Sequence, residues 1–130
     1  MSIADISGEG FVAYYLLKEL PANTDPLSQE NLLIFAAGPI TGTTISGSSR
    51  SSVGAKSPLT NGFGKSEVGG FWGAELKKAG YDAIVITGKA KTPIYLWIHN
   101  EQVEIQDASK LWGKETGEVQ QLLKKELNDK

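Results

Sequence analysis

The feature that most constrains this chain is a long glycine-rich segment in which acidic residues are largely missing. Residues 31–66 contain no Asp or Glu, while Arg50, Lys56 and Lys65 supply three positive charges. Nine of the fifteen glycines fall within residues 38–73, among many serines and threonines. Glycine permits close backbone approach, and clustered backbone amides attract phosphate. Two interpretations stay open: a loop-rich interior stretch with little charge, or a surface that binds an anionic ligand.

Composition indicates a folded domain and excludes several classes of site. The 130 residues are 40% hydrophobic and 22% charged with a net charge of −2, so we expect one domain or part of one. Without cysteine, the chain has no disulfides and no thiolate ligands for zinc or an iron–sulfur cluster. The single histidine, His99, excludes a histidine-rich metal site. The net charge and the lack of a basic stripe argue against a nucleic-acid partner.

The distribution of apolar residues argues against a membrane protein or a secreted one. No apolar run approaches the roughly 18 residues that suggest a membrane span. The opening MSIADISGEG lacks a basic region followed by an apolar core, so it does not resemble a secretory signal. We therefore expect a cytoplasmic protein with no membrane partner.

Hydrophobic periodicity and turn residues predict an α+β domain. Phe11 and Tyr15 lie four residues apart and Pro21 stops the run, as expected of a helix. Gly80 stands where glycine commonly ends a helix, and Asn100 marks the turn of a hairpin. The predicted helices cover residues 11–20, 71–79 and a stretch from about 116, and the predicted strands cover 32–37, 50–56, 83–87, 94–98 and 103–105. Short strands and a hairpin among helices indicate the α+β class.

Familiar nucleotide-binding and nucleophile motifs are missing from the sequence. Residues 42–54 lack the lysine–hydroxyl pair of a P-loop. Gly62 and Gly64 are followed by Glu67 where the dinucleotide-binding pattern needs a glycine. The hydroxyl cluster of residues 41–49 has no nearby histidine, which argues against a serine nucleophile.

Arg50 is the only arginine of the chain, since the other twelve basic residues are lysines. It lies between Ser49 and Ser51 in the segment without acids, so no carboxylate near it in sequence pairs with it. A planar guanidinium binds phosphate through two N–H groups at once, which lysine does not. We single out Arg50 as an anion-binding residue, with an ion pair to a distant carboxylate as the alternative.

Four stretches of the sequence resemble one known family in their order and spacing. They are ENLLIFAAGPITGT, SRSSVGAKSPLTNG, GGFWGAELKKAGYDAIVITGKAKTPIYLWI and EIQDASKLWGK. From about Gly8 to the final helix, the chain resembles the N-terminal domain of the aldehyde:ferredoxin oxidoreductase family, which are tungsten or molybdenum enzymes with a bis-pterin cofactor. The resemblance implies an α+β fold, a mixed β-sheet with two to three helices, that forms half of a base on which the pterins lie.

The same resemblance implies several residues that face the cofactor. The arginine in the position of Arg50 lies between the pterin and an iron–sulfur cluster. The stretch in the position of Glu67, Val68, Gly69 and Gly70 approaches the pterin phosphates, and the backbone carbonyl at Glu67 helps to hold a magnesium ion there. Many relatives have asparagine at this position. A carboxylate beside phosphates repels them unless a cation neutralises it.

The turn after the predicted strand 32–37 adds three cofactor-facing candidates, Gly38, Thr41 and Gly42. These residue types equally suit a tight turn that only reverses the chain. Both interpretations stay open.

The resemblance also implies a chain that is incomplete at both ends. Relatives have a further β segment where this chain has MSIADIS, and they continue past the final helix into the second half of the domain. Their later domains carry the cysteines of a [4Fe–4S] cluster and the substrate cavity. We therefore expect residues 1–130 to form a single partial domain with no iron–sulfur ligands and no activity of its own.

Three functional hypotheses remain. The first is a pterin-binding module of an oxidoreductase that, when complete, converts an aldehyde to a carboxylate and passes electrons to ferredoxin, with a partner chain as one source of the missing domains. The second is a stand-alone binding or assembly module without catalytic activity. Removing half of a sheet domain leaves an unpaired strand edge, which favours a homo-oligomer. The third is a fragment without a function of its own.

Overall fold

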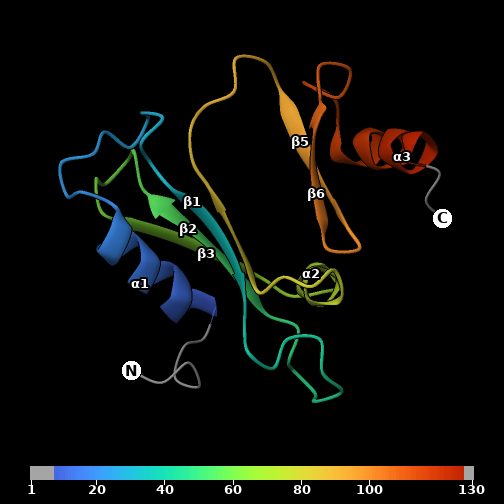
Figure 1. The fold of residues 1–130 in the computed structure, drawn as a ribbon, viewed down its shortest axis with the longest axis horizontal. Helices are drawn as coiled ribbons and strands as arrows, with labels where there is room; N and C mark the ends of the chain where they lie inside the picture. The colour runs from blue at the N-terminus through green and yellow to red at the C-terminus, as the bar shows by residue number, and fades with distance from the viewer. Residues whose placement is uncertain (1–7, 128–130) are drawn as a thin grey trace. The chain divides into compact units, whose positions relative to one another are not determined.

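A computed structural model describes residues 8–127 of the chain (Figure 1). The helices are α1 (Gly8–Glu19), α2 (Trp72–Lys78) and α3 (Thr116–Glu126), and the strands are β1 (Leu33–Ala37), β2 (Ser51–Lys56), β3 (Phe63–Val68), β4 (Ala83–Ile86), β5 (Ile94–His99) and β6 (Gln102–Asp107). The predicted α+β class is confirmed. The expectation for the opening MSIADIS falls on residues 1–7, outside the described residues.

The strands form two sheets. One has four strands in the order β3-β2-β1-β4, and every neighbouring pair in it is antiparallel. The other consists of β5 and β6. The chain divides into two compact units, one comprising the chain up to Lys89 together with Ile98–Gln102, and the other comprising Ala90–Trp97 and the chain from Val103 onward.

Helix α1 packs on one face of the four-stranded sheet and forms the core of the first unit with it (Figure 1). Val12 and Ile34 are fully buried there. Because side chains alternate along a strand, Ile34 and Ala36 of β1 point to the same face. Burying each large aliphatic side chain contributes about 1.5–3 kcal/mol, so this contact is the main source of cohesion in the unit.

A glycine on β2 allows the helix to come close. Gly54 lies opposite Ile34 in the sheet register. A Cβ added at Gly54 would stand 2.6 Å from Cγ1 of Val12 and 3.0 Å from the carbonyl oxygen of Gly64. Both distances are shorter than packed carbon and oxygen atoms normally allow, so the position requires glycine for steric reasons.

Helix α2 ends as the sequence predicts. Gly80 has a φ of +92°, and its N–H donates to the carbonyl of Lys77 at 3.0 Å. The N–H of Tyr81 donates to the carbonyl of Leu76 at 3.1 Å. This pair of bonds is the Schellman motif, which satisfies carbonyls that a helix end leaves free.

One strand escapes sequence analysis, and the other elements are recovered with shifted ends. All eight predicted elements overlap an observed helix or strand, and the first helix begins three residues early, at Gly8. The missed strand is β3, whose residues alternate glycine, charge and hydroxyl and are mostly exposed. It exists because its backbone pairs with β2, which places Lys56 opposite Phe63 and Ser51 opposite Val68.

The turn of the predicted hairpin lies in Ile98–Gln102 and belongs to the first unit, while most of β5 and β6 and all of α3 belong to the second. Asn100 and Glu101 both have positive φ, 46° and 64°, which is the backbone of a tight two-residue hairpin turn. The expected turn at Asn100 is thus confirmed. Within residues 8–127, no helix is both long and apolar enough to cross a membrane.

We expect Gly54→Ala to lower the free energy of unfolding by about 1–3 kcal/mol, because the new methyl group displaces either Val12 or the neighbouring strand. Urea unfolding of the 130-residue chain measures this change. The matched control is Gly62→Ala in the same hairpin, where the added Cβ meets only Oγ1 of Thr60 at an ordinary 3.6 Å. Equal effects of the two substitutions would contradict the steric argument.

Candidate functional site

A pocket of about 470 Å³ opens beside the first turn of α1, where the loop after β1 meets the start of β2. It belongs entirely to the first unit. Its lining residues are Gly8, Glu9, Gly38, Pro39, Ile40, Thr41, Gly47, Ser48, Arg50, Ser52 and Glu67. Four of the eight predicted site residues are therefore brought together: Gly38, Thr41, Arg50 and Glu67.

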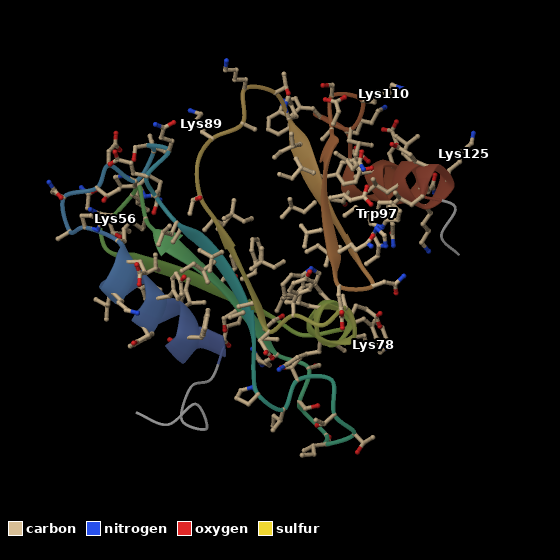
Figure 2. All side chains as sticks on the ribbon, viewed as in Figure 1. Lys56, Lys78, Lys89, Trp97, Lys110 and Lys125 are labelled. Atoms are coloured by element: carbon tan, nitrogen blue, oxygen red, sulfur yellow. The ribbon has the colours of Figure 1, made fainter. Side chains whose placement is uncertain are left out.

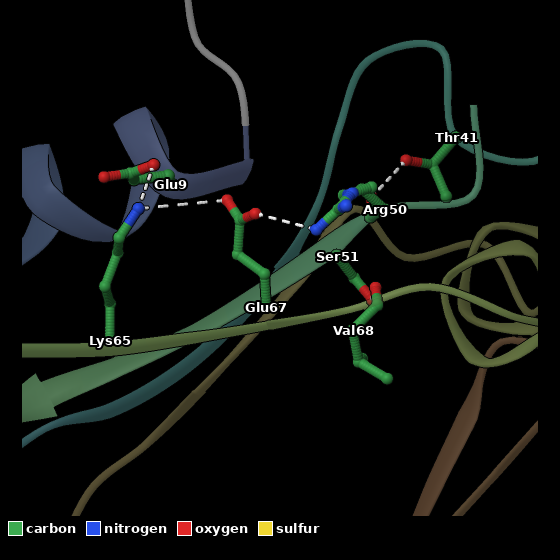
Figure 3. Close-up of polar contacts among 7 residues, drawn as sticks. All are labelled: Glu9, Thr41, Arg50, Ser51, Lys65, Glu67 and Val68. Carbon is green, nitrogen blue, oxygen red and sulfur yellow. Dashed lines mark hydrogen bonds and ion pairs between the residues drawn. The ribbon is translucent and has the colours of Figure 1, made fainter. Parts of the chain in front are cut away.

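Arg50 and Glu67 form an ion pair across two strands (Figure 3). Arg50 directly precedes β2, and Glu67 lies in β3 opposite Ser52. Nη1 of Arg50 is 3.3 Å from Oε2 of Glu67. The arginine side chain is 72% exposed and the glutamate side chain 32% exposed. The distant carboxylate considered for Arg50 thus exists, and it belongs to another predicted site residue.

Lys65 extends this pair toward the helix (Figure 3). Its Nζ lies 2.5 Å from Oε2 of Glu9 in the first turn of α1 and 4.0 Å from Oε1 of Glu67. Lys65 and Glu67 are two residues apart in β3, so both side chains stand on the face that α1 covers. The hydrogen bond to Glu9 raises the pKa of Lys65 above its ordinary 10.5; partial burial opposes this, and the charges of Glu9 and Glu67 add to the increase. Charges therefore alternate along Glu9, Lys65, Glu67 and Arg50.

The loop after β1 is held by Thr41, which is 5% exposed. Its Oγ1 accepts from the N–H of Gly38 at 2.8 Å and donates to the carbonyl of Arg50 at 2.9 Å. Gly42 has a φ of +86° and lies against Ala74 of α2, outside the pocket. The tight-turn interpretation accounts for the hydrogen bonds of Gly38 and Thr41 and for the conformation of Gly42.

The remaining predicted residues follow Glu67 but do not line the pocket. Val68 is 56% exposed, and its carbonyl lies 3.5 Å from the hydroxyl of Ser51. A Cβ at Gly69 would meet Oγ of Ser49 at 3.5 Å, so this glycine passes close to the loop before β2. Gly70 has a φ of +102° and open space around it. Only Gly70 of this glycine pair is thus surrounded by open space.

The third cation of the acid-free segment serves the fold instead. Lys56, labelled in Figure 2, donates from Nζ to the backbone carbonyls of Ala22 at 2.5 Å and Thr24 at 2.7 Å. Within the described part of the chain, no group of three or more His, Asp or Glu side chains could hold a metal ion. The only predicted metal contact, the backbone carbonyl of Glu67, is of another kind.

Sequence analysis did not single out Glu9 or Lys65 as site residues. Lys65 was noted only as one of three cations in the segment without acids. The strand β3, which puts Lys65 and Glu67 on the same face, was not predicted. Glu9 lies 56 residues before Lys65, and only the docking of α1 on the sheet joins them. A strand prediction for residues 63–68 would have placed Lys65 and Glu67 on one face.

Comparison with known proteins identifies the family. The sequence model of the family described as the aldehyde ferredoxin oxidoreductase N-terminal domain matches residues 3–130 of this chain. The chain belongs to this family. It is 54% identical over 121 residues to a tungsten-containing aldehyde ferredoxin oxidoreductase of Pyrococcus abyssi, covering 93% of the chain and 20% of that protein. It is 46% identical over 125 residues to the WOR-like subunit of an aliphatic sulfonate oxidoreductase of Pyrococcus furiosus, covering 94% and 20%.

A solved structure of another enzyme contains a region with the same fold as this chain. The active-site complex BamBC of benzoyl coenzyme A reductase, determined with 1,5-dienoyl-CoA, matches with a TM-score of 0.93 and 46% identity. The match covers 98% of this chain and 19% of the other. The chain thus spans about a fifth of the aldehyde ferredoxin oxidoreductases and related proteins that it matches. The predicted resemblance to this family is confirmed.

We expect Thr41→Val to lower the free energy of unfolding by about 1–3 kcal/mol, because it leaves the Gly38 N–H and the Arg50 carbonyl without their partner. Urea unfolding measures the loss. Thr43→Val is the control, since the hydroxyl of Thr43 donates to the carbonyl of Ile40 at an exposed position where water can replace it. A Thr41 variant as stable as the Thr43 variant would contradict the assignment.

The raised pKa of Lys65 predicts a pH dependence of stability. The folded state holds this proton more tightly than the unfolded state, whose pKa is 10.5. The contribution of Lys65 is therefore complete below pH 10.5 and is lost as the pH rises through the raised value. Unfolding free energies of the natural chain and of Lys65→Met should draw closer together as the pH rises above 10.5. A constant difference would refute the ion pair.

Proposed function

We propose that this chain is the pterin-binding N-terminal part of a tungsten-containing aldehyde ferredoxin oxidoreductase, and that residues 1–130 form part of one domain there. The observation that carries the proposal is Arg50, which lines the pocket and whose side chain is 72% exposed. The tungsten-containing relatives, one of them 54% identical, support the identity of the ligand.

Arg50 and the backbone near it suit the phosphate part of a pterin. Nη1 of Arg50 contacts Glu67, and with 72% of the side chain exposed we infer that the other N–H groups of the guanidinium stay accessible. Such a fork binds phosphate oxygens in pairs. Gly69 and Gly70 have no side chains and Gly70 has open space around it, so a ligand can approach this backbone closely. We propose that the backbone carbonyl of Glu67 meets the magnesium ion that accompanies the phosphates.

The role of this chain is to bind and orient. The bound metal–pterin group supplies the redox chemistry, in which an aldehyde and water yield a carboxylate, three protons and two electrons. Arg50 holds an anionic part of that group and adds positive charge beside it. The chain has no cysteine, so thiolate ligands of an iron–sulfur cluster would lie outside residues 1–130.

A second candidate is assembly with another chain, and the outer strands favour it. Among residues 8–127, β3 and β4 each pair with a neighbour on one side only of the four-stranded sheet. Strand edges of this kind accept further strands. The partner on this hypothesis is a second copy or a chain with the remaining domains. Native mass spectrometry of the purified chain distinguishes monomer, homo-oligomer and pterin-loaded species.

The pterin proposal is tested by native mass spectrometry of the 130-residue chain mixed with metal-free molybdopterin. We expect retention of the pterin by the natural chain and at least about tenfold weaker retention by Arg50→Ala, because the bidentate phosphate contact is lost.

Lys89→Ala is the matched control, since it removes one exposed positive charge outside the pocket (Figure 2). Equal retention by the two variants, or none by the natural chain, would refute the proposal. Unchanged thermal unfolding of Arg50→Ala excludes a loss through misfolding.

A further inference from the structure

The charges in the wall of the pocket do not by themselves suit an anion. Three lining residues are charged: Glu9 and Glu67 carry one negative charge each, and Arg50 carries one positive charge. The wall alone therefore has a net charge of −1. Like charges repel over these distances, so phosphate would meet an unfavourable potential in such a pocket. Some other group must offset one of the carboxylates.

Lys65 lies within reach of both carboxylates and supplies the one positive charge that is missing. Its Nζ contacts Glu9 at 2.5 Å and Glu67 at 4.0 Å, although Lys65 is not part of the wall. Including it brings the local charge to zero. The strand fixes this arrangement, because Lys65 and Glu67 are two residues apart and share one face of β3. The lysine side chain is only 41% exposed, which reduces the screening of its charge by water.

Glu67 stands between two cations and uses a different oxygen for each. Oε1 faces Lys65, and Oε2 lies 3.3 Å from Nη1 of Arg50 (Figure 3). If Lys65 were absent, Arg50 would be the only cation in contact with the Glu67 carboxylate within the described part of the chain. The full negative charge of Glu67 would then compete with a ligand for the guanidinium.

We propose that Lys65 is a positioning residue of the anion site: by offsetting part of the negative charge of Glu9 and Glu67, it leaves Arg50 available to the phosphate of the ligand. This inference rests on the proposed function of the pocket and adds a residue that the pocket wall does not contain. It applies to phosphate-bearing ligands in general, since it concerns charge alone.

Isothermal titration calorimetry tests the inference by measuring the affinity of the full chain for inorganic pyrophosphate. The natural chain should bind. Lys65→Met should bind about tenfold more weakly, equivalent to about 1.4 kcal/mol, because Glu67 is left uncompensated. The double variant Lys65→Met/Glu67→Gln should recover to within about threefold of the natural chain, since the offending charge is gone. Lys89→Met is the charge-matched control and should bind as the natural chain does.

Each alternative outcome is decisive. Recovery of pyrophosphate affinity in the double variant supports the inference. If Lys65 only stabilised the fold, removing the charge of Glu67 would not restore the affinity. Natural affinity in Lys65→Met, or no recovery in the double variant, overturns it while leaving the proposed pterin function intact. Absence of pyrophosphate binding by the natural chain also overturns it, and retention of molybdopterin then decides separately whether the proposed function survives.

Discussion

The contact of α1 with the sheet at Gly54 is the constraint on which the rest of the first unit depends. Because position 54 has no side chain, Val12 reaches the backbone of β2 and is fully buried beside Ile34. The same docking brings the first turn of the helix against β1, where a Cβ on Gly8 would come within 2.7 Å of the Ala36 carbonyl oxygen. That turn is one wall of the pocket, so the packing of the core also sets the dimensions of the site.

Elements with apolar periodicity could be predicted from the sequence, and elements defined by pairing could not. β1 and β4 are short apolar runs, and α2 ends at a glycine whose positive φ a side chain would oppose. β3 has no apolar alternation, and only its register with β2 makes it a strand. The early start of α1 at Gly8 has a similar origin, since close approach to the sheet, and not helix propensity, selects glycine there.

The candidate site also has residues that the sequence could single out and residues that only the pairing of strands or the docking of a helix brings in. Arg50 could be singled out because it is the only arginine and no acid lies near it in sequence. Its partner Glu67 is 17 residues away and reaches it through the register of two strands. Lys65 and Glu9 depend on that register and on the docking of a helix. For Thr41 the sequence left a binding role and a turn equally open, and the hydrogen bonds of its hydroxyl account for the turn.

The position of Glu9 and Gly8 in both α1 and the pocket wall links two equilibria. If the first turn of the helix frays, Lys65 loses its nearest carboxylate and the pocket loses one side, so the open form of the helix cannot hold a ligand in the same way. A ligand that binds only the docked form therefore shifts the equilibrium of the helix toward docking. Amide hydrogen exchange in this turn therefore reports on occupancy of the pocket. A bound anion would slow that exchange, because it stabilises the packing of α1 on the sheet.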